Sequence, residues 1–275
     1  MRQVIDSNFL QSDQLRAYLG ASRDNQAVIT DYAAMEAHKG NTLKSIYRSM
    51  EVLCEFPEQV VILKSTMIVC GLRGKDADLQ EPLIDRHQTN GFPTYCRQLR
   101  AAQEGDVGLH RDILQHGRVA TAQMARVQAD VAILPEVFSD MMTVFTKDEI
   151  SILRHGTPLT DAILDKLMRS TMMLAVNLFK NHPNGGWLPT ATDLPNTFIF
   201  RFSLCAYLLH LDWISKGSQQ VIKPEKLRND MVDLNFATFA TYFDGLLSAD
   251  KKLTRIYLRA NYILRQIISW YRDDG

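Results

Sequence analysis

Apolar and polar positions follow two alternating patterns over the first 64 residues of the chain. Residues 3–5, 27–30 and 59–63 are short runs rich in β-branched side chains, which is typical of strands buried in a sheet. Between them, apolar side chains recur at spacings of three and four, most clearly over residues 43–54, and Pro57 ends that pattern. Strands that alternate with helices predict a parallel α/β sheet with right-handed crossovers.

From about residue 72 the pattern is almost entirely helical. A capping-box sequence from Thr146 to Glu149 predicts one helix start, and the stretch from His182 to Gly186 predicts a turn. Apolar side chains at helical spacing predict further helices over residues 93–103, 107–133, 135–145, 160–178 and 197–216.

The α/β pattern returns near the end of the chain. We expect a helix over residues 224–242, a short apolar strand over 245–250 and an amphipathic helix over 251–271. The last strand is expected to rejoin the first sheet. The predicted organisation is therefore a central parallel sheet with flanking helices and a large all-α insertion, arranged as an α/β core (residues 1–71), the insertion (72–222) and the second part of the core (223–275).

Composition narrows the class of protein. Hydrophobic residues make up 46% and charged residues 23% of the chain, which is typical of a globular protein and unlike a disordered one. Lys plus Arg equals Asp plus Glu at 31 each, so a nucleic-acid partner would have to meet a local basic patch. Four cysteines without a CxxC spacing suggest separate core residues in a reducing cytoplasm. No apolar leader opens the chain and charges interrupt its most apolar segment, residues 198–214, so we expect a cytoplasmic protein without a membrane partner.

Four carboxylates fall where a parallel sheet would bring them together. Asp6 and Asp250 end the first and last predicted strands, Glu36 lies in the helix after the second strand, and Asp233 lies in the helix before the last one. Ligands of parallel sheets bind at the carboxyl ends of the strands. Clustered carboxylates need a cation, and oxygen ligands favour Mg²⁺ or Mn²⁺. Such ions activate water and stabilise in-line attack on a phosphodiester.

Neighbouring polar residues are candidates for supporting roles. Asn8 and Ser248 are expected to hold a ligand or a water molecule. Asp31, Asp230 and Asp244 are reserve carboxylates; Asp31 is also placed to cap the helix that follows it, and Asp244 precedes a glycine as turn residues do.

Basic residues suggest two places where phosphate could bind. Lys251, Lys252 and Arg255 lie beside Asp250 at the start of the last helix and are the stronger candidates for substrate binding. The helical middle contains a second set of basic residues: Arg97, Arg100, His110, Arg111, His116, Arg118 and Arg126. Acidic residues are interspersed among them. The set could therefore form either an RNA-binding face or an ordinary solvated helix face.

Three segments together resemble the PIN-domain superfamily of metal-dependent nucleases. They are the opening VIDSN with Asp6, the segment AVITDYAAMEA with Glu36, and the closing DLNFATFATYFDGLLSADKKL with Asp233 and Asp250. In that family an Asp, a Glu and two further Asp residues occur in this order and bind one or two divalent metals for RNA hydrolysis. The resemblance covers roughly residues 1–70 and 224–255, under half of the chain.

This resemblance implies a PIN-like endoribonuclease in which the four carboxylates hold Mg²⁺ or Mn²⁺, with RNA as the partner and a toxin or defence role. Small toxin-type members lack the helical middle, which is expected to shape substrate entry, bind a protein partner or mediate homo-oligomerisation. Two other functions stay open. A catalytically silent PIN-like scaffold would bind RNA or protein through the insertion, and a phosphatase-like hydrolase would use Asp6 as nucleophile, although Asn8 stands where its second Asp is needed.

Overall fold

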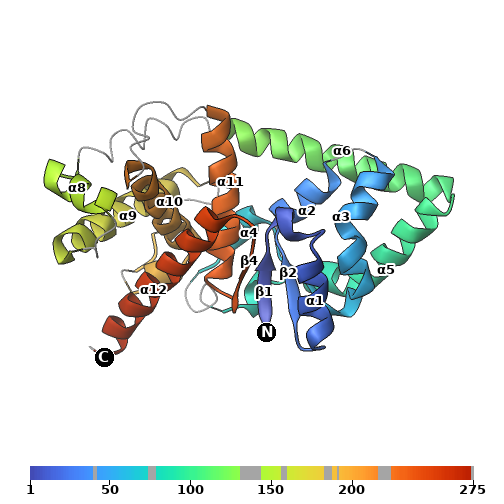
Figure 1. The fold of residues 1–275 in the computed structure, drawn as a ribbon, viewed down its shortest axis with the longest axis horizontal. Coiled ribbons are helices and arrows are strands. Elements are labelled where there is room, and N and C mark those ends of the chain that lie inside the picture. Colours follow the sequence, from blue (N-terminus) through green and yellow to red (C-terminus); the bar gives the residue numbers. More distant parts are fainter. Residues whose placement is uncertain are drawn as a thin grey trace.

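The structure, a computed structural model, is built around a four-stranded parallel sheet at the centre of the molecule (Figure 1). The strand order is β3-β2-β1-β4, with Val4 of β1 in register with Val28 of β2 on one side and Leu246 of β4 on the other. The prediction that the last strand rejoins the first sheet is therefore confirmed. The strands are β1 (Arg2–Ile5), β2 (Gln26–Ile29), β3 (Val60–Ile62) and β4 (Gly245–Leu247).

The structure describes residues 1–39, 42–73, 79–130, 144–155, 160–182, 188–190, 192–215 and 224–273. The helix expected over 135–145 and the turn expected after His182 lie almost entirely outside these residues. The described α-helices are α1 (Asp13–Ala21), α2 (Asp31–His38), α3 (Leu43–Glu55), α4 (Thr66–Cys70), α5 (Arg86–Gln103), α6 (Val107–Asp130), α8 (Lys147–His155), α9 (Asp161–Asn181), α10 (Phe198–Ser215), α11 (Pro224–Ala240) and α12 (Lys251–Asp273). Short 3₁₀ turns are η1 (Ser7–Phe9), η2 (Pro57–Gln59), η4 (Glu81–Leu83) and η6 (Leu194–Asn196).

Side-chain caps explain why several helices begin where they do. The hydroxyl of Thr160 accepts a hydrogen bond from the backbone of Ile163 at the start of α9. The predicted capping box before α8 is present, since Glu149 and Thr146 each accept from the other's backbone N–H at 2.8 and 3.3 Å. One helix start was predicted wrongly: α5 begins seven residues before Pro93, at a cap supplied by Asp85.

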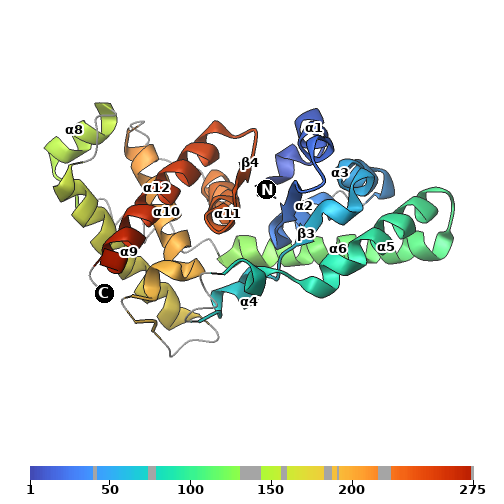
Figure 2. The same cartoon turned by 90° about the horizontal axis from the view of Figure 1, so that it is seen from below.

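The helical middle divides into two groups on either side of the sheet (Figures 1 and 2). Helices α5 and α6 pack against α2 and α3, and α5 also contacts β3. On the other side, α10 packs against α8, α9, α11 and α12, while α11 contacts β1 and β4. An α/β core with a large helical content is thus confirmed, and both helical groups share one continuous apolar core with the sheet.

The cysteines differ from the sequence-based expectation of four separate core residues. Cys54 of α3 and Cys96 of α5 form a disulfide across 5.4 Å between their Cα atoms, whereas Cys70 and Cys205 are thiols. Burial raises the pKa of both thiols to about 12. The pairing joins residues 42 positions apart, so no local spacing indicated it. None of the described helices is long and apolar enough to cross a membrane.

Candidate functional site

Asp6 lies at the carboxyl end of β1 and is almost fully buried. Its Oδ2 accepts a hydrogen bond of 2.5 Å from the hydroxyl of Ser248, which follows β4. Burial raises the pKa of Asp6, and the charge of Asp250 adds to that rise, while the hydrogen bonds from Ser248 and Asn8 oppose it. A buried carboxylate therefore lies at this edge of the sheet, and a bound proton or cation would stabilise it by neutralising its charge.

Asp250 joins this carboxylate through Ser248. The backbone N–H of Asp250 donates to Ser248 Oγ at 3.0 Å, so one hydroxyl links the two acidic residues. Asp250 also caps α12, because its Oδ1 accepts from the backbone of Lys252 and Leu253 at 2.6 and 3.2 Å. Asn8 completes the connection between the two strand ends, since its Oδ1 accepts from the backbone of Ala249 at 3.2 Å.

Asp233 brings α11 into the same cluster. Burial, reinforced by the negative charges of Asp6, Glu36 and Asp230, raises the pKa of this carboxyl to about 7. Only Lys252 acts in the opposite direction among the named causes. Charges act on one another more strongly in a partly buried setting than in bulk water. Asp6, Glu36 and Asp230 therefore lie near enough to Asp233 to influence its pKa, and Asp250 influences that of Asp6.

A buried ion pair occupies one end of this cluster. Asp230 is 5% exposed and its Oδ1 forms an ion pair with the ammonium group of Lys252. The other oxygen of Asp230, Oδ2, is buried and accepts no hydrogen bond from the described part of the chain. Lys252 was expected to contact substrate phosphate, but the structure places its ammonium as an internal counter-ion of the carboxylates.

The two remaining reserve carboxylates have structural partners. Asp31 accepts hydrogen bonds from the backbone and hydroxyl of Thr66, at 2.7 and 2.9 Å, and so caps α4, while its Oδ1 also accepts from the backbone of Tyr32 in its own helix at 3.0 Å. Thr30 caps α2 in its place. Asp244 accepts from the backbone N–H of Arg2 at 2.6 Å, which places it at the opposite edge of the sheet from Asp6.

The donor set suits a hard divalent cation in its chemistry. Its members are carboxylate oxygens, and the unbonded Oδ2 of Asp230 is a buried acceptor of the kind that a cation satisfies. As the side chains stand, no three His, Cys, Asp or Glu residues in the described ranges form a group that could hold a metal ion. Binding would therefore have to draw the carboxylates closer together, against the repulsion that raises the pKa of Asp233.

One ion pair beside the site was not predicted from the sequence. Arg255 of α12 lies 2.5 Å from the carboxylate of Asp212, which is buried in α10. The sequence did contain a signal for this pair. Asp212 lies inside the most apolar helix of the chain, and a buried charge requires a partner of opposite sign. This pair fixes α12, and with it Lys251 and Asp250, against the helical middle.

Comparisons with known proteins add no further constraint. No family model, curated protein or solved structure matches this chain. The function must therefore be argued from the carboxylate cluster and its surroundings.

Proposed function

We propose that this protein is a metal-dependent nuclease with a PIN-like core, an endoribonuclease that hydrolyses RNA phosphodiesters. One observation carries the proposal: Asp6 and Glu36 come from elements other than that of Asp233, yet the charges of both act on Asp233. Holding like charges close together lowers the stability of the folded protein. Such an arrangement is typical of sites that bind a cation or perform catalysis. The buried Oδ2 of Asp230, which accepts no hydrogen bond from the described residues, also supports a cation-binding site.

The residues have distinct roles in this proposal. Asp6, Glu36, Asp233 and Asp250 would hold Mg²⁺ or Mn²⁺, and Asp230 is the reserve ligand. The bound ion would activate water for attack on the phosphodiester and stabilise the charge that develops there. Ser248 keeps Asp6 and Asp250 in a fixed relation through its two hydrogen bonds of 2.5 and 3.0 Å.

Three further side chains contribute charge and alignment. Asn8 holds the two strand ends together through the backbone of Ala249. Lys252 offsets part of the carboxylate repulsion from inside the site. Lys251 and Arg255 lie at the entrance on α12, where they would contact the phosphates of a bound strand.

Cleavage of end-labelled single-stranded RNA and DNA, with Mg²⁺, Mn²⁺ or EDTA, tests the proposal. We expect metal-dependent cleavage of RNA that falls by at least about 100-fold in Asp6→Asn and Asp233→Asn. A matched control is Asp13→Asn on α1, whose carboxylate is 96% exposed and pairs with Arg16. That variant should cleave at the unmodified rate.

Two outcomes would overturn the proposal. Cleavage that is equal in Asp6→Asn and Asp13→Asn would assign the activity to something other than this cluster. Folded protein that binds RNA but cleaves no substrate under any metal would favour the catalytically silent scaffold. This second function is supported by the absence, among the described side chains, of three acidic, His or Cys residues placed to hold a metal ion.

A further inference from the structure

A surface cavity opens directly beside the carboxylate cluster. It encloses about 300 Å³ and is lined by Ser248, Lys251, Thr254, Arg255, Leu258 and Arg259. All but the first belong to α12, and Ser248 is the residue whose hydroxyl binds Asp6. The cavity therefore begins at the candidate site and continues along one face of the helix.

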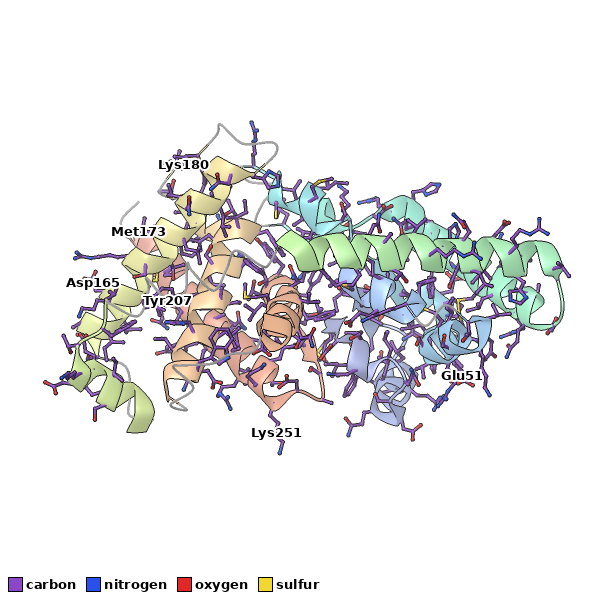
Figure 3. All side chains as sticks on the ribbon, turned by 90° about the horizontal axis from the view of Figure 1, so that it is seen from above. Glu51, Asp165, Met173, Lys180, Tyr207 and Lys251 are labelled. Carbon is purple, nitrogen blue, oxygen red and sulfur yellow. A yellow bond between two sulfur atoms is a disulfide. The ribbon has the colours of Figure 1, made fainter. Side chains whose placement is uncertain are left out.

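Basic side chains follow this face at intervals of one helical turn. Lys251, Arg255 and Arg259 are spaced four residues apart, which places them on one side of α12. Lys251 extends outward from the start of the helix (Figure 3), and Arg259 is exposed to solvent. The side chain of Arg255 is 41% exposed although it is paired with Asp212. The described lining of the cavity includes no acidic side chain, and Lys251 and Arg259 give it a positive charge in addition to the paired Arg255, which is complementary to phosphate.

Exposed apolar side chains accompany these cations. Leu258 is 58% exposed, and Tyr262, one helical turn further, is 66% exposed. Tyr257 and Ile256, on the opposite face of α12, are buried. Alternating cations and flat or apolar groups form the combination on which unpaired bases stack while their phosphates are neutralised.

We propose that the exposed face of α12 is a track for single-stranded nucleic acid that leads into the carboxylate cluster. Lys251, Arg255 and Arg259 contact successive phosphates, and Leu258 and Tyr262 contact the faces of bases. A duplex keeps its bases stacked on one another, so it offers no base face to Tyr262. The inference deepens the proposed nuclease function, since it specifies an unpaired strand and the surface over which that strand enters.

Fluorescence anisotropy tests the track without cleavage. The Asp6→Asn protein would be titrated in EDTA against labelled 12-nucleotide single strands of RNA and DNA and the corresponding duplexes. We expect at least about tenfold tighter binding of the single strands. Adding Tyr262→Ala should weaken single-strand binding about tenfold with an unchanged salt dependence, and Tyr262→Phe should restore it. Adding Arg259→Ala should weaken binding and lower the slope against log salt by about one.

A matched control separates the track from general surface charge. Arg169 on α9 has a side chain 75% exposed, comparable to the exposed residues of the track, and Arg169→Ala should change nothing. Equal affinity for duplex and single strand, with no effect of Tyr262→Ala, would overturn the proposal. So would displacement of the oligonucleotide by an equal concentration of an acidic peptide, because that would show a site for charge alone.

The result is distinguishable from failure of the proposed function. Metal-dependent cleavage that requires Asp6 but is unchanged in the α12 variants would refute the track and leave the nuclease intact. Selective single-strand binding without any cleavage would refute the nuclease and leave the track.

Discussion

Replacement of Asp233 by Asn is expected to stabilise the fold above neutral pH when divalent ions are absent. Burial, reinforced by the charges of Asp6 and Glu36, raises the pKa of Asp233 from 3.8 to about 7. The folded protein therefore holds this proton more tightly than the unfolded chain does. The carboxyl has no effect on the free energy of unfolding below pH 4, lowers it progressively between pH 4 and 7, and lowers it fully above pH 7.

The size of the effect follows from the same pKa values. The difference between 3.8 and about 7 converts to about 4 kcal/mol at 1.36 kcal/mol per pH unit. Asp233 keeps some contact with solvent, and neighbouring carboxylates relax when it ionises, so screening reduces this figure. We expect Asp233→Asn to gain about 1–2 kcal/mol at pH 8 and nothing at pH 4. The asparagine retains the shape of the side chain, so packing changes little.

Urea denaturation at pH 4, 5, 6, 7 and 8 in EDTA measures this gain, with Asp13→Asn as the exposed-carboxylate control. Addition of Mn²⁺ at pH 8 should then raise the stability of the unmodified protein and leave that of Asp233→Asn almost unchanged. An Asp233→Asn protein that is less stable than the unmodified one at pH 8 would refute the reasoning. A difference that is constant from pH 4 to 8 would also refute it, since the effect would then not be electrostatic.

Two other predictions concern the framework of the site. Asp31→Ala should lower the free energy of unfolding by about 2–3 kcal/mol, because the N–H and hydroxyl of Thr66 lose their acceptor. Metal-dependent cleavage should remain. A loss of cleavage without a loss of stability would instead make Asp31 a metal ligand. Cys54→Ser should lower the free energy of unfolding by about 3–4 kcal/mol under oxidising conditions, because the disulfide to Cys96 closes a loop of 42 positions in the unfolded chain. An equal loss in excess reductant would show that the effect does not come from the disulfide.

Local sequence patterns account for most of the sheet and its helices. Short apolar runs before acidic residues have few alternative structures, so β1 directly precedes Asp6 and β4 ends three residues before Asp250, and parallel pairing aligns the carboxyl ends of both strands. The start of α5 was missed because Pro93 usually marks a first helical turn, whereas the cap at Asp85 and the burial of Phe92 extend the helix before it.

The parts of the site that sequence alone did not predict depend on pairs of distant residues. Lys252 was expected to be free for substrate, and its choice of Asp230 depends on how α11 and α12 pack. Asp31 was expected to cap its own helix; it does accept from the backbone of Tyr32 there, but it also caps α4, where Ser65 supplies no side-chain cap. Helical spacing determines which face a residue occupies, but the partner on the facing element comes only from the fold.

The pairing of β1 with β4 also sets when the carboxylate cluster can exist during synthesis. Asp6 and the hydroxyl of Ser248 that binds it are 242 positions apart. At 5–20 residues per second, a ribosome needs roughly 12 to 50 s to make the chain between them. For most of that interval the nascent chain carries Asp6 and Glu36 but neither Asp233 nor Asp250. In the proposed nuclease the metal site would therefore form only late in synthesis, and a product that ends before Asp233 would lack two of its four carboxylates.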